Sequence, residues 1–309
     1  MILRNAVSLI LTATSCLVIA ACQAERTPES LFGPDAAGKL VLDGLLIVGR
    51  PLPPVYVTQT VAAVDRDSPR HAVVPDAVVE IRQGDRVFRY ARDPDAGPFQ
   101  YSPPPDPPEV VPGTKYVMVV TARGTTARTT TVTPGAFRVR EGVVLDQRTE
   151  SVQRRLKTFA DLAEGVFLAP ENRVVYKAGF LEARFDPIDV PGYQVGIVSL
   201  DRDAEEVARE ISEDSPDRTG SSPAIESTEG RVRLPWFAIY YTGRHLMRIY
   251  AVDRNWYDYA RSGAEAQESW FGGLAGENFR RPLFHVEGGI GLFGSASVDS
   301  IGFVIVEDP

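Results

Sequence analysis

Residues 115–133 read KYVMVVTARGTTARTTTVT, a sequence dominated by Val and Thr. Two runs rich in β-branched residues, Lys115–Ala122 and Thr126–Thr133, flank the short break Arg123-Gly124-Thr125. β-branched side chains fit the pleated surface of a strand, and a Gly-containing break between two such runs is typical of a hairpin. This stretch therefore predicts two paired antiparallel strands.

The surrounding sequence repeats this pattern. Ala77–Arg82 and Arg86–Tyr90 flank Gln83-Gly84-Asp85, a second hairpin signal, and Val55–Val64 alternates apolar and polar residues. Six or more short strands within about 95 residues suggest an immunoglobulin-like β-sandwich over residues 39–137.

The pattern changes at residues 138–165, where we expect a linker with a short helix at Val152–Leu162. Strand patterns then resume and predict a second β-rich domain over residues 166–309. Within it, Val232–Tyr241 and His245–Asp253 resemble a hairpin, and helices are expected at Asp203–Ile211 and Asn255–Arg261. The expected fold class is all-β with minor helices.

The N-terminal segment predicts the location of the protein. Residues 1–21 form a short apolar run with one charge, typical of a signal peptide. They end in Ile19-Ala20-Ala21-Cys22, which resembles the lipobox of bacterial lipoproteins. We expect cleavage between Ala21 and Cys22, lipid on the Cys22 thiol, and a polar tether over residues 22–38. The alternatives are an ordinary cleaved signal peptide and an uncleaved anchor.

Composition and charge argue against several classes of function, namely nucleic-acid binding and metal or cofactor chemistry. The formal net charge of −8 gives no general basis for binding nucleic acid. The two cysteines, Cys16 and Cys22, both precede the body, so it has no disulfide framework. The three histidines have no metal-ligand spacing, and we expect neither a metal nor a cofactor.

Aromatic residues supply the candidate site. Trp256, Tyr257, Tyr259 and Trp270 lie close together in the sequence, near Phe271 and further from Trp236. Exposed together, they could form a platform for sugar rings or a partner chain; the alternative is that they fill the core or a domain interface. The glycine-rich run Glu287–Gly294 lacks the lysine and the following helix of a phosphate loop. We expect it to turn into a strand with Phe293 buried.

Several segments together resemble a known family. They are Tyr250-Ala251-Val252-Asp253, Trp256-Tyr257-Asp258-Tyr259, Glu277-Asn278-Phe279 and the run Val286–Ser297. With the lipobox and the Leu-Val-Leu-Asp-Gly segment near residue 40, their order resembles the lipoprotein family known as domain of unknown function 4249. Arg280 departs from the proline-type turn that is commoner in this part of the family.

The resemblance implies an outer-membrane lipoprotein of Bacteroidetes-like bacteria, facing the periplasm or the cell surface. Genes of such proteins often accompany TonB-dependent receptors, so the resemblance implies a non-enzymatic accessory or binding partner of such a receptor. The alternatives are a surface adhesin or glycan-binding protein and, third, a hydrolase.

Overall fold

The computed structural model describes residues 37–61, 69–93, 95–176, 179–207, 218–227, 229–234, 238–262 and 282–306. The chain divides into two compact units, residues 1–39 with 59–72 and residues 40–58 with 73–309. The described part of the first unit includes a 3-10 turn, η3 (Pro69–Ala72), in which the His71 carbonyl oxygen accepts a hydrogen bond from Gln59 Nε2. Apart from Gln59, the last residue of β2, the strands described below belong to the second unit.

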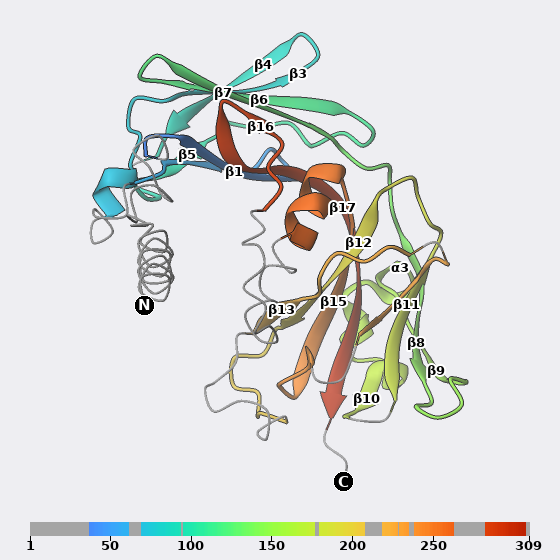
Figure 1. Cartoon of the computed structure of the whole chain (residues 1–309). Helices are drawn as coiled ribbons and strands as arrows, with labels where there is room; N and C mark the ends of the chain where they lie inside the picture. Colours follow the sequence, from blue (N-terminus) through green and yellow to red (C-terminus); the bar gives the residue numbers. More distant parts are fainter. Residues whose placement is uncertain are drawn as a thin grey trace, which may run out of the picture. The chain divides into compact units, whose positions relative to one another are not determined.

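Within residues 40–132, two pairs of strands form the two hairpins that the sequence predicts (Figure 1). β3 pairs with β4, and β6 pairs with β7 over eight consecutive residue pairs. The strands are β1 (Leu40–Ile47), β2 (Val55–Gln59), β3 (Val78–Gln83), β4 (Arg86–Arg92), β5 (Gln100–Ser102), β6 (Lys115–Ala122) and β7 (Thr125–Val132). Their inward-facing Val, Leu, Ile and Tyr side chains form one buried cluster, which also takes in Phe293.

Residues 139–306 supply the remaining elements. The strands are β8 (Val139–Leu145), β9 (Val152–Leu156), β10 (Arg173–Val175), β11 (Phe180–Phe185), β12 (Gly192–Ser199), β13 (Thr219–Ser221), β14 (Arg231–Leu234), β15 (Gly243–Val252), β16 (Val286–Glu287) and β17 (Gly289–Val306). The short helices are α3 (Phe159–Leu162), η4 (Ala163–Phe167) and η5 (Pro170–Asn172), and residues 254–262 are also helical. The expected all-β class with minor helices is confirmed.

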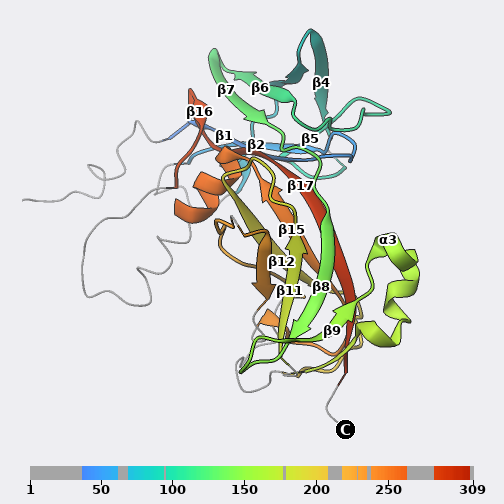
Figure 2. The same cartoon turned by 90° about the vertical axis from the view of Figure 1, so that its right-hand side faces the viewer.

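Two sheets organise the described residues. Thirteen strands form the larger sheet, in the order β13-β12-β15-β17-β1-β2-β5-β4-β3-β6-β7-β16, with β10 paired to β17. The smaller sheet has the order β14-β11-β8-β9. It lies beside β12, β15 and β17 (Figure 2), and side chains from both sheets form a second buried cluster that includes Phe185, Tyr193, Ile249 and Phe303.

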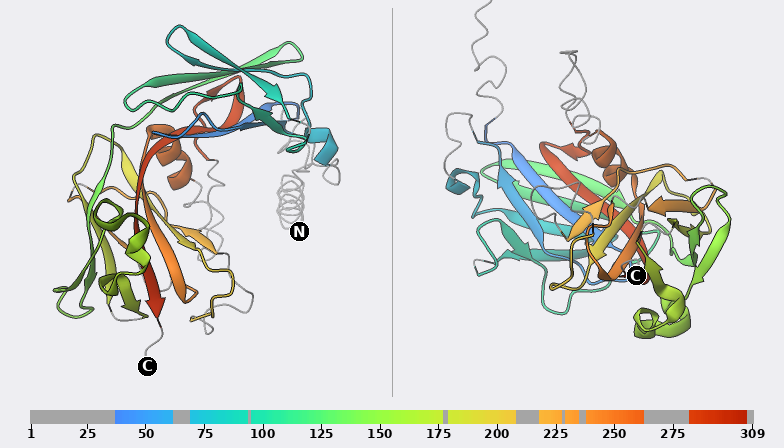
Figure 3. Two further views of the ribbon diagram at one scale, coloured as in Figure 1. Left: turned by 180° about the vertical axis from the view of Figure 1, so that it is seen from behind. Right: turned by 90° about the horizontal axis from the view of Figure 1, so that it is seen from below.

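Strand β17 joins the two parts of the large sheet. Its first half runs parallel to β1, and its second half pairs with β15 and β10, as the red ribbon in Figure 3 shows. Gly291 allows the close approach to β1: its φ is +118°, and a Cβ there would lie 2.0 Å from the Leu42 carbonyl oxygen. The glycine-rich run therefore enters a strand, and Phe293 is buried, as the sequence predicts.

Several local expectations differ from the structure. Residues 139–145 and 152–156 are strands of the smaller sheet, where the sequence suggested a linker, although α3 supplies a short helix after them. The sequence of β9 suggested a helix or linker because β9 is a charged strand at the edge of the sheet. Its Arg155 guanidinium pairs with Glu141 of β8, whereas Leu156 is buried. The domain boundaries and the immunoglobulin-like arrangement of residues 39–137 stay predictions. The sheet of that region also takes in β16 and the first half of β17.

Two further expectations were wrong for the described residues. β14 does not form a hairpin with β15; it pairs with β11 in the smaller sheet, while β15 pairs with β12 and β17. Residues 203–207 are not helical, because Glu206 bridges to Tyr241 and the Val207 N–H donates to the Tyr240 carbonyl oxygen. The rest of the expected helix, residues 208–211, lies outside the described residues.

Candidate functional site

The candidate site begins where β15 ends. Asp253 follows the strand directly, and its Oδ1 accepts a hydrogen bond from the backbone N–H of Trp256 (3.0 Å). This is the geometry of an N-cap, in which a short acidic side chain satisfies an otherwise unpaired N–H of the first helical turn. The helix of residues 254–262 therefore starts at a fixed point at the end of the sheet.

Asp253 also holds this helix against two distant strands. Its Oδ2 accepts a hydrogen bond from Thr131 Oγ1 of β7 (2.6 Å), and its Oδ1 accepts another from the Ser295 N–H of β17 (3.0 Å). Asn255 donates from Nδ2 to the carbonyl oxygens of Thr130 (2.7 Å) and Phe293 (2.8 Å). Burial raises the pKa of the Asp253 carboxyl. The hydrogen bonds that it accepts from Thr131, Ser295 and Trp256 offset part of that rise.

The helix separates the predicted platform residues. Trp256 is half-buried and Tyr259 is exposed, and both line the same groove. Tyr257 is buried instead, where it packs near Ala224 and donates from its hydroxyl to Glu226 Oε1 (2.8 Å). Tyr257 is thus a packing residue, because consecutive residues of a helix point in different directions. Trp270, Trp236 and Phe271 lie outside the described residues.

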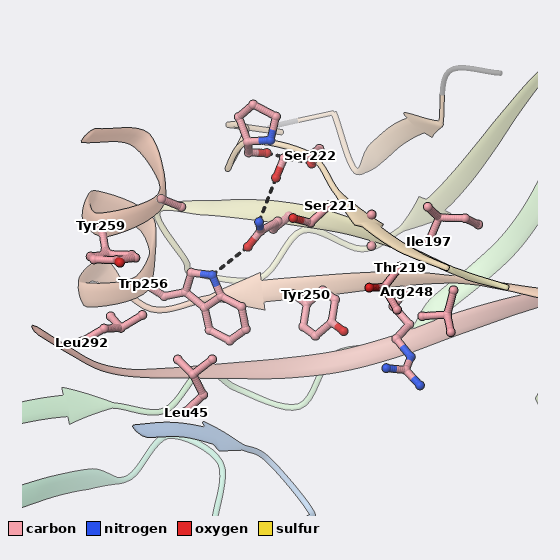
Figure 4. A pocket seen from close by; sticks show the side chains of 16 residues that line it. Leu45, Ile197, Thr219, Ser221, Ser222, Arg248, Tyr250, Trp256, Tyr259 and Leu292 are labelled. Carbon is pink, nitrogen blue, oxygen red and sulfur yellow. Dashed lines mark hydrogen bonds between the residues drawn. The ribbon is translucent and has the colours of Figure 1, made fainter. Parts of the chain in front are cut away.

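The groove has a volume of about 990 Å³ and lies on the face of β12 and β15 away from the smaller sheet (Figure 4). Its described lining combines rings, small residues and polar side chains. The strands contribute Leu45 of β1, Gln194, Gly196, Ile197 and Val198 of β12, Thr219, Gly220 and Ser221 of β13, Arg248 and Tyr250 of β15, and Leu292 of β17. Ser222 and Pro223 follow β13, and Trp256, Tyr259 and Ala260 come from the helix of residues 254–262.

The rings in the groove are held in place by their neighbours. The Tyr250 ring lies over Gly196, where a Cβ would lie 3.1 Å from Tyr250 Cε2, so the glycine lets the ring lie close to the sheet. The Trp256 ring centroid is 5.6 Å from that of Tyr250, with the ring planes tilted by 42°. Trp256 Nε1 donates to Gln194 Oε1 (2.7 Å), and Gln194 Nε2 donates to the Ser222 carbonyl oxygen (2.8 Å). This chain of bonds fixes both the indole and the amide.

The groove also contains a cation without a partner among the described residues. Arg248 is half-buried and forms no ion pair or hydrogen bond with any residue that the structure describes. Arg244, on the same face of β15, behaves differently, because its guanidinium lies 2.6 Å from Asp201 Oδ1. Arg248 thus differs from Arg244 in having no counter-ion among the residues that the structure describes.

His245 and His285 are not among the residues that line the groove. His245 is buried, stacks on Phe303 with ring centroids 5.6 Å apart, and its Nδ1 lies 2.9 Å from the Gly243 carbonyl oxygen. Burial lowers the pKa of His245. His285 Nε2 lies 2.8 Å from Asp258 Oδ2 near the protein surface. Over the described ranges, no group of three or more His, Cys, Asp or Glu residues could hold a metal ion.

Comparison with known proteins gives the family. The model of the domain of unknown function DUF4249 matches residues 27–301. The chain belongs to the DUF4249 family. A search of the curated proteins found no match. No helix within the described ranges is long and apolar enough to cross a membrane.

Sequence reasoning missed Arg248, Tyr250 and Gln194 of this DUF4249 protein. A signal for the first two was present, because alternation along β15 places them on the face opposite His245, Met247 and Ile249. Gln194 could not be found in this way, since its role depends on a tertiary contact with Trp256.

Proposed function

We propose that this DUF4249 protein is a non-enzymatic outer-membrane lipoprotein that holds a ligand in the groove beside Trp256. In this proposal, the lipid on Cys22 anchors the body, and the protein works beside a TonB-dependent receptor that takes up the ligand. The groove opens toward that receptor, so that bound ligand can be passed on.

The groove is the observation that carries this proposal. Ligand sites are concave, largely apolar and preformed, with a few polar groups in fixed positions. The groove matches this description, because Tyr250 and Trp256 are held by Gly196 and Gln194 and the cation of Arg248 is left for a ligand. Preformed side chains lose little conformational freedom when a ligand binds, which favours affinity.

The tether explains how a weak contact with a receptor would suffice. Residues 22–38 can span at most about 60 Å when fully extended. A body confined to that distance from the membrane stays at a high effective concentration near any receptor in the same membrane. The contact between the two proteins therefore does not need to be tight.

Recovery of the native complex tests the partnership. The lipidated protein is purified from its own outer membrane in mild detergent, and the proteins that accompany it are identified by mass spectrometry. We expect a TonB-dependent receptor to be recovered with the lipidated chain. Recovery of no receptor, while a known lipoprotein–receptor complex survives the same procedure, would contradict the proposal.

A surface glycan-binding protein or adhesin is the second candidate, and the aromatic lining of the groove is the observation that favours it. The pull-down separates the two, because an adhesin would bind its glycan without a receptor. Assays of the purified protein for hydrolysis of bound glycans would reveal the third alternative, a hydrolase.

A further inference from the structure

We propose that the groove binds an anionic oligosaccharide, with the sugar rings lying on Trp256 and Tyr250 and an acidic substituent on Arg248. This inference rests on the proposed ligand-holding function and names the chemical class of the ligand. It concerns the groove alone and does not depend on which receptor accompanies the protein.

The order of side chains along the groove fits a chain of sugar rings. Trp256, Tyr250 and Arg248 follow one another on the same side of β15 (Figure 4). The two rings lie 5.6 Å apart between centroids, a separation close to the length of one sugar residue. Aromatic rings offer an apolar face with a polar tip, which suits the C–H-lined faces and hydroxyl edges of pyranose rings.

The polar groups of the groove fit the hydroxyl groups of a sugar. Thr219 and Ser221 of the rim strand β13 are exposed, and their hydroxyls form no hydrogen bond with the residues described; neither does the hydroxyl of Tyr250. Each hydroxyl can both donate and accept, as sugar hydroxyls do. Gly220, between Thr219 and Ser221, leaves the rim without a bulky side chain at its centre.

Arg248 indicates that the ligand carries negative charge. The whole chain has a formal net charge of −8, which disfavours anions in general. Against that background, a half-buried guanidinium without a counter-ion among the described residues is a local site for a carboxylate or a sulfate ester. A guanidinium can bind either group through two parallel hydrogen bonds.

The lining favours a saccharide over an acidic peptide. A peptide that adds as a strand would use backbone groups at the edge of β13, which is three residues long. The fixed features lie instead on the floor, where Tyr250 rests on Gly196 and Trp256 is bonded to Gln194. Aromatic rings on the floor and hydroxyls on the rim suit the faces and edges of a sugar ring better than an extended backbone.

The test is isothermal titration of the full-length lipidated protein in a detergent without a sugar headgroup, such as lauryldimethylamine oxide. The probes are tetragalacturonate and tetramannuronate, a sulfated heparin tetrasaccharide, neutral cellotetraose and maltotetraose, and a tetraglutamate peptide. We expect saturable binding of at least one anionic oligosaccharide, and weaker binding of the neutral ones. Comparison of the uronates with the heparin fragment separates carboxylate from sulfate recognition.

Variants connect the binding to the groove. Arg248→Gln should weaken binding of the anionic oligosaccharide by about tenfold or more, because a charge-assisted hydrogen bond is lost. Arg138→Gln is the control, since Arg138 is exposed and is not among the residues that line the groove, and should leave binding unchanged. Trp256→Leu should also weaken binding, and Trp256→Phe should weaken it less because the ring is kept. Near-ultraviolet circular dichroism checks that each variant is folded.

Three results would overturn the inference: no binding of any anionic oligosaccharide, binding that Arg248→Gln leaves intact, or equally tight Arg248-dependent binding of tetraglutamate. The last would identify an acidic peptide as the ligand class. Each of these outcomes rejects an anionic saccharide bound at Arg248. If the pull-down nevertheless recovers a receptor, the receptor partnership stands.

Discussion

Asp253 should be the residue on which the position of the groove helix depends most. In Asp253→Ala, the N–H groups of Trp256 and Ser295 both lose the carboxylate that accepts their hydrogen bonds, and Asp253 and Ser295 are buried. An unsatisfied buried donor costs about 1–3 kcal/mol and a lost N-cap about 0.5–2 kcal/mol. Thr131 retains Ser295 Oγ at 2.7 Å as a partner, and the variant no longer buries a charge. We therefore expect a net loss of about 2–4 kcal/mol in the free energy of unfolding.

Asp253→Asn is the informative comparison. Its amide oxygen can replace Oδ1 and accept from both N–H groups, while its NH₂ group can donate to the Thr131 hydroxyl, which accepts as readily as it donates. The expected loss for Asn is about 1 kcal/mol or less. The two variants thus differ although both remove the charge, because only one removes the hydrogen bonds.

Urea unfolding followed by far-ultraviolet circular dichroism measures the difference. With a slope of about 3 kcal/mol per molar urea, Asp253→Ala should lower the midpoint by about 1 M relative to wild type. The wild-type carboxyl also has a raised pKa, so the folded state holds its proton more tightly than the unfolded state. The stability of wild type relative to Asp253→Asn should therefore fall as pH rises from below 3.8 through the raised pKa. A midpoint for Asp253→Ala equal to that of wild type, or equal losses for Ala and Asn, would refute this reasoning.

Three further changes are testable, two from the structure and one from the sequence of the N-terminal segment. Glu182→Gln should lower the free energy of unfolding by about 1–3 kcal/mol, because the buried carboxylate accepts from two partly exposed arginines, while Glu109→Gln, on an exposed residue, should have no effect in the same urea assay. Burial alone would raise the pKa of Glu182, but the hydrogen bonds from the two arginines hold this pKa below 4.5. The stabilisation that the carboxylate contributes should therefore be complete above pH 4.5 and disappear as pH falls through the lowered pKa. A difference in stability between wild type and Glu182→Gln that does not change over acid pH would contradict this. Gly291→Ala should cost about 3 kcal/mol or more, or prevent folding, whereas Gly135→Ala, where a Cβ meets nothing within 4 Å, should be tolerated in the same unfolding measurement. Cys22→Ala should yield a chain without acyl mass that is released or left unprocessed, and intact-mass analysis that finds lipid on it would exclude Cys22 as the acceptor.

The sequence predicted those parts of the fold that depend on local patterns. The hairpins β3–β4 and β6–β7 and the entry of Phe293 into a strand are set by alternation and by glycine at the turns. The partner of β14 could not be found this way, because alternation shows that a segment is a strand but not which strand it pairs with. β9 was missed because its exposed arginines hide the strand pattern, and their partners come from other strands: Arg155 pairs with Glu141 of β8, and Arg154 donates to the Arg173 carbonyl oxygen of β10.

The site was predictable in part for similar reasons. The sequence placed Trp256 and Tyr259 in the candidate platform, and both line the groove. It could not separate Tyr257 from them, because burial of its ring depends on Ala224 and Glu226, which are more than thirty residues earlier in the chain. The free cation of Arg248 likewise becomes visible only when the absence of a partner among the described residues can be checked in three dimensions.

Photo-crosslinking in the native outer membrane tests the central claim most directly, namely that the groove delivers its ligand to a receptor. A photoreactive amino acid is placed at Thr219 on the exposed groove rim or, as a control, at Gln153 on the outer face of the smaller sheet. The proposal predicts a cross-link to a TonB-dependent receptor from Thr219, and little or none from Gln153. Cross-links to the receptor from Gln153 alone, or from neither position, would contradict it.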